Sequence, residues 1–311
     1  MINLIRDLDP REYEHPLDKK ALDTLHDTRG LDTLVKKFHE YGVEHLFNIQ
    51  CTGSNLKVTA GSLPEVHQLV VEVCDTLSLA ELPEIYIQHT EKLQGLVTGV
   101  DHPILIISSA ALESLTPAEN RFMIGRMVGH IKSQHVLYYE IGYLLPVLSN
   151  ILAGPTLGFG SLLTMGLEVA LLRWSRMSEY TADRAGLLAC QDVAAATAAL
   201  AKVAGLPQKY YDDFDVDGFI KQARAFQGYD ETNYNRALKY ASLMLGEQNW
   251  SVGRAHELLK WIDTGGYQYV LERKATQRRL ERTLVKFCNN CGAKVPASTD
   301  FCPSCGFRFL I

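Results

Sequence analysis

Four cysteines near the C-terminus are the residues whose spacing points most directly to chemistry. Cys288 and Cys291 form one C-x-x-C pair, Cys302 and Cys305 form a second, and ten residues separate the pairs. A glycine follows each pair and permits the tight turn of a metal-binding knuckle. Four thiolates fill a tetrahedral site, so the sequence predicts one structural Zn²⁺ in a ribbon at residues 287–311. Redox chemistry is the weaker alternative, because redox C-x-x-C motifs usually occur singly beside a βαβ pattern.

Two stretches in the middle of the chain carry a second group of candidate residues. Residues 126–135 read R-M-V-G-H-I-K-S-Q-H, and residues 178–186 read S-E-Y-T-A-D-R-A-G. They resemble the motifs of zinc metallopeptidases of the HtpX and CAAX-prenyl-protease type, which carry H-E-x-x-H on one helix and E-Y-x-A-D on a later one. The resemblance extends over roughly residues 15–270. It implies a zincin-like peptidase domain.

The first motif lacks the residues that zinc hydrolysis requires. The resemblance places Arg126 and His130 at the two histidine-ligand positions, Met127 at the general base and Glu179 at the third ligand. Arg126 stays charged and has no lone pair to offer a metal, and Met127 cannot accept a proton. His130 and Glu179 leave two ligands where a catalytic zinc needs three. We therefore predict a vestigial site with no intact catalytic residue.

The carboxylates of this site need a substitute for the missing metal. Asp183 stands where the family has a carboxylate that steadies the ligand histidines. Buried carboxylates without a cation are costly. We therefore predict that Arg126 occupies the place of the zinc and pairs with Glu179 and with Asp183. This pairing would keep the fold and abolish the chemistry.

Two further features bear on any remaining activity. Residues 93–99 read L-Q-G-L-V-T-G, with Gln94 and Gly95 where the family's substrate-binding strand has asparagine and alanine. This departure weakens the case for cleavage, although an edge strand can hold a peptide without cutting it. His135 and Glu140 would have to join His130 to rebuild a metal site. We expect His135 to point away, because residues five apart on one helix face different sides.

The elements that must position these residues are mostly helical. At 311 residues, with 47% apolar and 22% charged residues, the chain has the composition of a folded globular protein. Short strands are predicted at 84–88 and 104–108, and Thr116, Pro117 and Glu119 start a helix that runs to about Tyr139. Further helices are predicted at residues 16–41 (two), 64–77, 178–190, 193–203, 216–227, 231–245, 251–262 and 267–285. The fold class is α+β, with a peptidase-like domain at 1–270, a basic linker helix at 271–286 and the ribbon.

An apolar insert interrupts the peptidase-like domain. Residues 141–167 contain no charged side chain, but Pro146, Gly154–Pro155 and the following glycines divide them into pieces too short to span a bilayer comfortably. Two buried helices joined by a turn are favoured over a hairpin that contacts lipid. The N-terminus does not read as a secretory signal. We expect a cytoplasmic protein, with peripheral attachment to the cytoplasmic face of a membrane as the alternative.

The charge of the chain and its C-terminal ribbon indicate which class of partner it binds. Residues 272–286 hold six basic and two acidic side chains, which favour a solvated helix face over a contact with phosphate or anionic lipid. The net charge of −5 argues against nucleic acid. The ribbon resembles C-terminal zinc ribbons of many bacterial proteins, which are usually docking modules.

We therefore predict a catalytically inactive metallopeptidase-like protein that binds a protein partner, such as a membrane complex, as a scaffold or assembly factor. The alternative is an active zinc metalloendopeptidase with an atypical site.

Overall fold

The computed structural model describes residues 2–28, 30–31, 35–36, 38, 43–152, 159–226 and 250–272, together with the short strands at 286–287 and 294–295. The chain divides into two compact units, Met1–Leu271 and Glu272–Ile311. The helix predicted at 231–245, most of the linker helix and the four ribbon cysteines (Cys288, Cys291, Cys302, Cys305) lie outside the described residues. In the second unit, the described strands β5 (Lys286–Phe287) and β6 (Lys294–Val295) pair antiparallel.

A small mixed sheet forms one layer of the first unit. Its strand order is β1 (Leu56–Val58), β2 (Glu84–Gln88), β4 (Ile104–Ser108) and β3 (Gly95–Thr98). β2 and β4 run parallel, while β1 and β3 pair antiparallel with their neighbours. The predicted strands at 84–88 and 104–108 are confirmed, and so is the mostly helical α+β class. β3, which contains Gly95, is an edge strand as expected.

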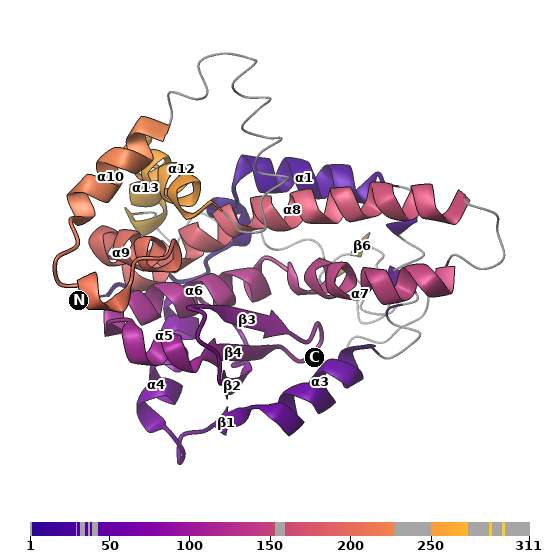
Figure 1. Ribbon diagram of the computed structural model, residues 1–311, viewed down its shortest axis with the longest axis horizontal. Helices are drawn as coiled ribbons and strands as arrows, with labels where there is room; N and C mark the ends of the chain where they lie inside the picture. Colours follow the sequence, from indigo (N-terminus) through magenta and orange to yellow (C-terminus); the bar gives the residue numbers. More distant parts are fainter. Residues whose placement is uncertain are drawn as a thin grey trace. The chain divides into compact units, whose positions relative to one another are not determined.

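Helices cover both faces of this sheet (Figure 1). Their bounds are α1 Pro16–His26, α3 Val43–Ser54, α4 Pro64–Thr76, α5 Ser109–Ser114, α6 Pro117–Lys132, α7 Val136–Leu152, α8 Phe159–Cys190, α9 Val193–Val203, α10 Val216–Ala225, α12 Ser251–Asp263 and α13 Gly266–Glu272, with 3-10 turns at Pro10–Glu12 and Gln208–Tyr210. The side chains of β4 alternate between the two faces. Leu105 and Ile107 join the main core with α4, α6 and α8, whereas Ile104 and Ile106 pack with Cys51 of α3.

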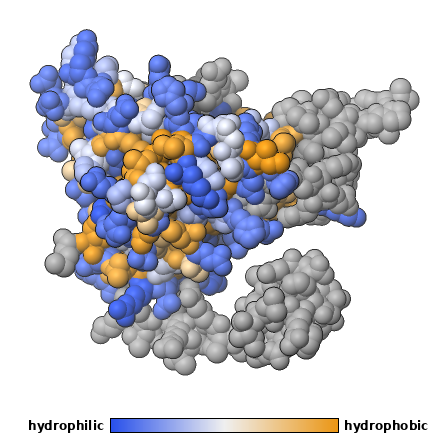
Figure 2. Space-filling model, turned by 90° about the horizontal axis from the view of Figure 1, so that it is seen from below, coloured by the Kyte–Doolittle hydropathy of each residue, from blue (hydrophilic) through white to orange (hydrophobic). Residues whose placement is uncertain are grey.

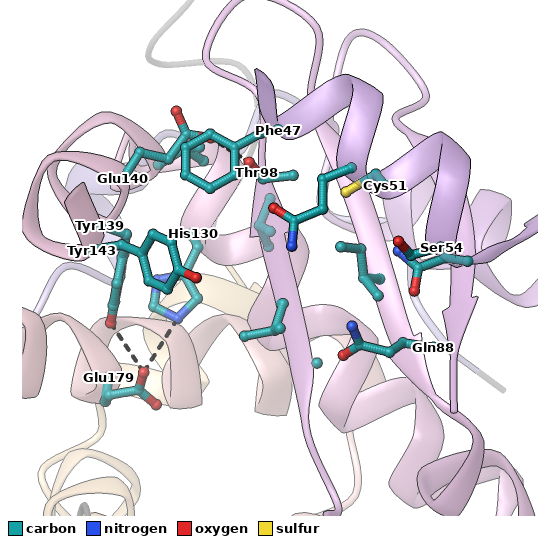
Figure 3. A pocket seen from close by; sticks show the side chains of 17 residues that line it. Phe47, Cys51, Ser54, Gln88, Thr98, His130, Tyr139, Glu140, Tyr143 and Glu179 are labelled. Atoms are coloured by element: carbon teal, nitrogen blue, oxygen red, sulfur yellow. Dashed lines mark hydrogen bonds and ion pairs between the residues drawn. The ribbon is translucent and has the colours of Figure 1, made fainter. Parts of the chain in front are cut away.

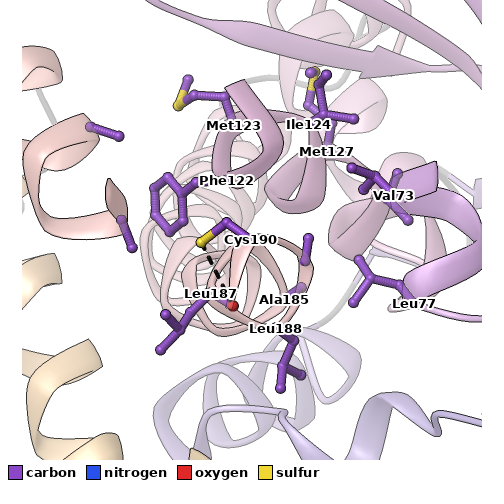
Figure 4. Close-up of a cluster of buried hydrophobic side chains, with 14 of the residues drawn as sticks. Val73, Leu77, Phe122, Met123, Ile124, Met127, Ala185, Leu187, Leu188 and Cys190 are labelled. Carbon is purple, nitrogen blue, oxygen red and sulfur yellow. Dashed lines mark hydrogen bonds between the residues drawn. The ribbon is translucent and has the colours of Figure 1, made fainter. Parts of the chain in front are cut away.

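Helices α6 and α8 pack closely and form the centre of the main core (Figure 4). Gly125 and Gly129 of α6 face Ala189 and Ala185 of α8, and a Cβ at either glycine would overlap these alanines. The absent side chains let the two backbones approach. The two motifs, one on each helix, are thereby brought face to face.

The start of α6 is as predicted, but its end is not. The Thr116 hydroxyl accepts from the Glu119 amide, and the Glu119 carboxylate accepts from the Thr116 amide, so the capping box is complete. The expectation that the helix runs to about Tyr139 is wrong, because α6 ends at Lys132 and Gln134 adopts a left-handed conformation with φ of 59°. A new helix, α7, then begins at Val136.

The apolar insert forms the end of α7 and the beginning of α8, while residues 153–158 lie outside the described part. Across the described ranges, none of the helices combines the length and the apolar character that crossing a membrane requires.

Candidate functional site

Three helices bring charged side chains together beneath the edge of the sheet. α6 supplies Arg126, α8 supplies Glu179 and Asp183, and α12 supplies Arg254. Arg126 reaches this position over Gly186 of α8, where a Cβ would lie 2.8 Å from Arg126 Cγ. A side chain at position 186 would therefore displace the arginine from the site.

The four side chains form a buried network of two cations and two anions. Arg126 Nε donates to Asp183 Oδ1 at 2.8 Å, and Arg126 Nη2 donates to Glu179 Oε2. Arg254 Nε donates to Asp183 Oδ2 at 2.8 Å, and its Nη1 lies 3.7 Å from Glu179 Oε2. Arg126 is 8% exposed and Asp183 is 1% exposed. The predicted pairing of Arg126 with both carboxylates is confirmed.

The charges of the network, together with burial, determine the protonation states of Glu179 and His130. Burial alone would raise the pKa of Glu179, but the charges of Arg126 and Arg254 outweigh it and hold that pKa at about 2. Burial lowers the pKa of His130 to about 3, although Glu179 opposes the shift. Glu179 is therefore ionised and His130 neutral at physiological pH. Burial also raises the pKa of Tyr139, whose hydroxyl lies 3.0 Å from Glu179 Oε1.

Met127, at the general-base position, packs against the edge strand. It is buried, and its Sδ occupies the space where a Cβ of Gly95 would lie. The absence of a side chain at Gly95 is thus what accommodates the methionine. The two departures from the family pattern, one on α6 and one on β3, are physically coupled.

His135 lies beside His130, contrary to the expectation that it points away. The two Nδ1 atoms are 3.0 Å apart, and His135 Nε2 lies 3.3 Å from Asp18 Oδ2. The cause is the left-handed residue Gln134 after the end of α6, because His135 is then not part of one continuous helix with His130. Glu140 lies at another contact, where it accepts from the hydroxyl of Thr98 and from the amide of Gly99 at 2.6 Å. It joins α7 to the end of β3.

The donor set does not fit a catalytic zinc ion. Arg126 occupies one ligand position, and Glu179 Oε2 already accepts from that guanidinium. His130 Nε2 and Glu179 Oε1 are 3.7 Å apart, and among the described residues no group of three or more His, Cys, Asp or Glu side chains is placed to hold a metal ion. A positive guanidinium would also repel Zn²⁺.

A cavity of about 380 Å³ opens next to the network, between α3, α7 and the outer face of the sheet (Figure 3). His130, Tyr139 and Glu179 lie on one side of it, and Ser54 and Gln88 lie on the opposite side. Leu96 and Val97 of the edge strand line the space between. The cavity therefore runs from His130 and Glu179 along β3.

The site residues predicted from the sequence lie together in the structure, but further residues of the site were not predicted. Arg126, Met127, His130, Glu179 and Asp183 do gather at one place, as predicted. Arg254, Tyr139 and His135 were not foreseen as parts of the network. Arg254 lies within residues 15–270, the range of the family resemblance, and that resemblance was the available signal.

Comparisons with known proteins give a consistent result. The model for peptidase family M48 matches residues 62–260, and a zinc-ribbon domain model matches residues 287–309. Plastoglobule-localized metallopeptidase 48, chloroplastic, of Arabidopsis thaliana is 27% identical over 272 residues, which cover 87% of this chain and 78% of that protein. Protease HtpX homolog 2 of Methanosarcina acetivorans is 20% identical over 191 residues, covering 53% of this chain and 64% of that protein. No solved structure matches the chain significantly.

Proposed function

The chain belongs to peptidase family M48 and carries a C-terminal zinc-ribbon domain, and we propose that it is a member without peptidase activity that acts as a protein-binding scaffold or assembly factor. One observation carries the proposal. The guanidinium of Arg126 lies between Glu179 and Asp183, at a position that a zinc ligand would need.

The remaining residues cannot perform hydrolysis in any other evident way. Met127 cannot take a proton from an attacking water. His130 is neutral, but a pKa of about 3 makes it a weak base. The carboxylate of Glu179 is held by two guanidinium groups, which lower its basicity further. Among the residues that the structure describes near the network, no group is therefore suited to activate water.

The chain can bind a protein partner without the residues that hydrolysis requires. β3 is a sheet edge, and Leu96 on it is 46% exposed. An extended segment of a partner can add to such an edge through backbone hydrogen bonds. Hydrophobic patches also interrupt the hydrophilic surface of the face seen from below (Figure 2). Leu46 and Ile49 of α3, the helix at the bottom of Figure 1, are each more than half exposed. These features support a partner surface around α3 and β3.

The apolar insert is a second contact region in this proposal. Tyr143 of α7 is 70% exposed, and Val169 and Leu172 of α8, just beyond the insert, are also exposed. Large apolar side chains in such positions favour a protein or lipid contact. We therefore propose a partner within or beside a membrane complex, with the zinc ribbon as a docking module.

The test is a count of zinc in the purified full-length protein by elemental mass spectrometry. A matched variant carries Cys288→Ser and Cys291→Ser in the ribbon, and cleavage of an unfolded protein substrate is followed for both. We expect one zinc per chain, none in the variant, and no cleavage that a chelator abolishes. Two zinc ions per chain with chelator-sensitive cleavage would overturn the proposal.

An active zinc metalloendopeptidase is the second candidate. The names of both relatives, a metallopeptidase and a protease, favour it. It requires that Arg126 leave the network when metal enters, so that His130, Glu179 and another group can coordinate. The same zinc count decides between the two candidates.

A further inference from the structure

The cavity beside the network has walls that discriminate between ligands by charge. Its volume of about 380 Å³ is in the range of sites for small molecules. Among the described residues that line it, none is lysine or arginine. Two carboxylates, Glu140 and Glu179, do line it. A negatively charged ligand would therefore find no cation in these walls.

One end of the cavity is polar but uncharged. Gln50, Ser54 and Asn55 from the C-terminal part of α3 and the residue after it, with Gln88 of β2, provide amide and hydroxyl groups there. Asn55 Oδ1 is buried and has no hydrogen-bond partner among the described residues. A buried acceptor of this kind is stabilised when a donor reaches it. A hydroxyl or amide head group could supply that donor, whereas an ionised carboxylate could not.

The middle of the cavity, between this polar end and the end that holds Glu140 and Glu179, is apolar. Phe47 and Cys51 of α3, Leu96 of β3 and Ile106 of β4 line it. Figure 3 shows Phe47 and Cys51 between the Ser54 side and the Tyr143 side. An apolar chain lying across this surface would remove it from water, at about 25 cal/mol for each Å² buried.

We propose that this cavity binds a neutral amphipathic small molecule, with a hydroxyl or amide head at Asn55 and Gln88 and an aliphatic tail along Phe47, Leu96 and Ile106. The proposed binding differs from peptide hydrolysis, because no bond of the ligand is broken. It shares Leu96 with the partner surface proposed above, but the ligand lies inside the cavity, between α3 and the outer face of the sheet.

The proposal predicts that the cavity prefers a neutral head group to an ionised carboxylate. Moving an ionised carboxylate into walls without a cation costs several kcal/mol unless the group takes up a proton. Decanol and decanoate have aliphatic tails of nearly the same length, so the difference between their affinities reports the effect of the head group. We expect decanol to bind at least about tenfold more tightly than decanoate at neutral pH.

The test is isothermal titration calorimetry of the full-length protein with decanol and with decanoate, both below the concentrations at which they aggregate. Asn55→Leu removes the unpartnered acceptor and is expected to weaken decanol binding about fivefold or more. Asn48→Leu is the matched control. Asn48 lies on α3, the helix that ends one residue before Asn55, and it also has a buried Oδ1 without a partner among the described residues, but it does not line the cavity. It is expected to leave decanol binding unchanged.

A second pair of variants tests the location of the tail. Cys51→Phe places a ring in the cavity and is expected to abolish decanol binding, while Gly53→Phe places the same ring on the same helix in open space. Circular dichroism and the unfolding temperature check that both variants fold. Equal affinities for decanol and decanoate would overturn the proposal, as would no decanol binding at all, or decanol binding that survives both Asn55→Leu and Cys51→Phe. None of these outcomes changes the zinc count, so a failure here is distinguishable from a failure of the proposed function.

Discussion

Replacement of Arg126 by methionine tests whether the buried guanidinium has taken over the structural task of a metal. The variant leaves Arg254, at 3.7 Å, as the one guanidinium paired with Glu179 among the described residues, and it removes one donor from Asp183. The charges of Arg126 and Arg254 hold the pKa of Glu179 at about 2, well below its usual range. We expect Arg126→Met to lower the free energy of unfolding by about 3 kcal/mol near neutral pH, within the range for breaking a buried pair.

The pH dependence has a definite sign. The folded-state pKa of Glu179 is depressed, so its contribution to stability is complete above the unfolded-state pKa of about 4.5 and is lost as pH falls towards 2. The difference between wild type and Arg126→Met should therefore shrink over that interval. Urea unfolding followed by tryptophan fluorescence, at several pH values from about 7 down to about 3, measures this difference.

Two further variants make the test specific. Arg11 pairs with Asp9 at 2.7 Å but its side chain is 81% exposed, so Arg11→Met should cost less than about 1 kcal/mol. The double variant Arg126→Met, Glu179→Met replaces the buried pair by apolar side chains and should recover most of the lost stability. A cost at Arg126 no larger than at Arg11, or one that does not change with pH, would refute the reasoning.

Three other predictions follow from single contacts. Gly95→Ala puts a Cβ against Met127 Sδ and should destabilise the protein by about 1–3 kcal/mol, and Met127→Ala in the same chain should restore most of that loss in urea unfolding. His130, with a pKa of about 3, should show no change of its Cε1 proton shift in NMR spectra between about pH 8 and pH 5, whereas exposed histidines titrate near 6.5. Glu140→Ala removes the acceptor for Thr98 and Gly99, so amide hydrogen exchange at Gly99 should accelerate while exchange in β2 stays unchanged.

The features that the sequence predicted correctly are those with local causes. The strands at 84–88 and 104–108 are isoleucine-rich runs, and the capping box at Thr116 and Glu119 marks the start of α6 from neighbouring residues alone. The Arg126 network could also be foreseen. Residues four apart on a helix share a face, and two buried carboxylates require positive charge nearby.

The features that were missed depend on tertiary structure or on weak local signals. α6 ends without a glycine, asparagine or proline, because Gln134 takes the left-handed conformation instead. The prediction that the helix continued therefore misplaced His135. Arg254 is 71 residues from Asp183 in the sequence, and nothing local indicates which carboxylate a distant arginine will meet. The packing of Met127 on Gly95 joins two elements whose contact only the fold reveals.

The side chains that depart from the family motif fit the residues that surround them. Met127 fits because position 95 has no side chain, and Arg126 fits because position 186 has none. The positive charge of Arg126 balances a carboxylate that would otherwise be buried without enough countercharge. Reverting Arg126 to histidine and Met127 to glutamate would leave an uncompensated carboxylate at the edge strand and remove a cation from the network. The site thus behaves as part of the core, which supports a protein that keeps the peptidase fold for binding.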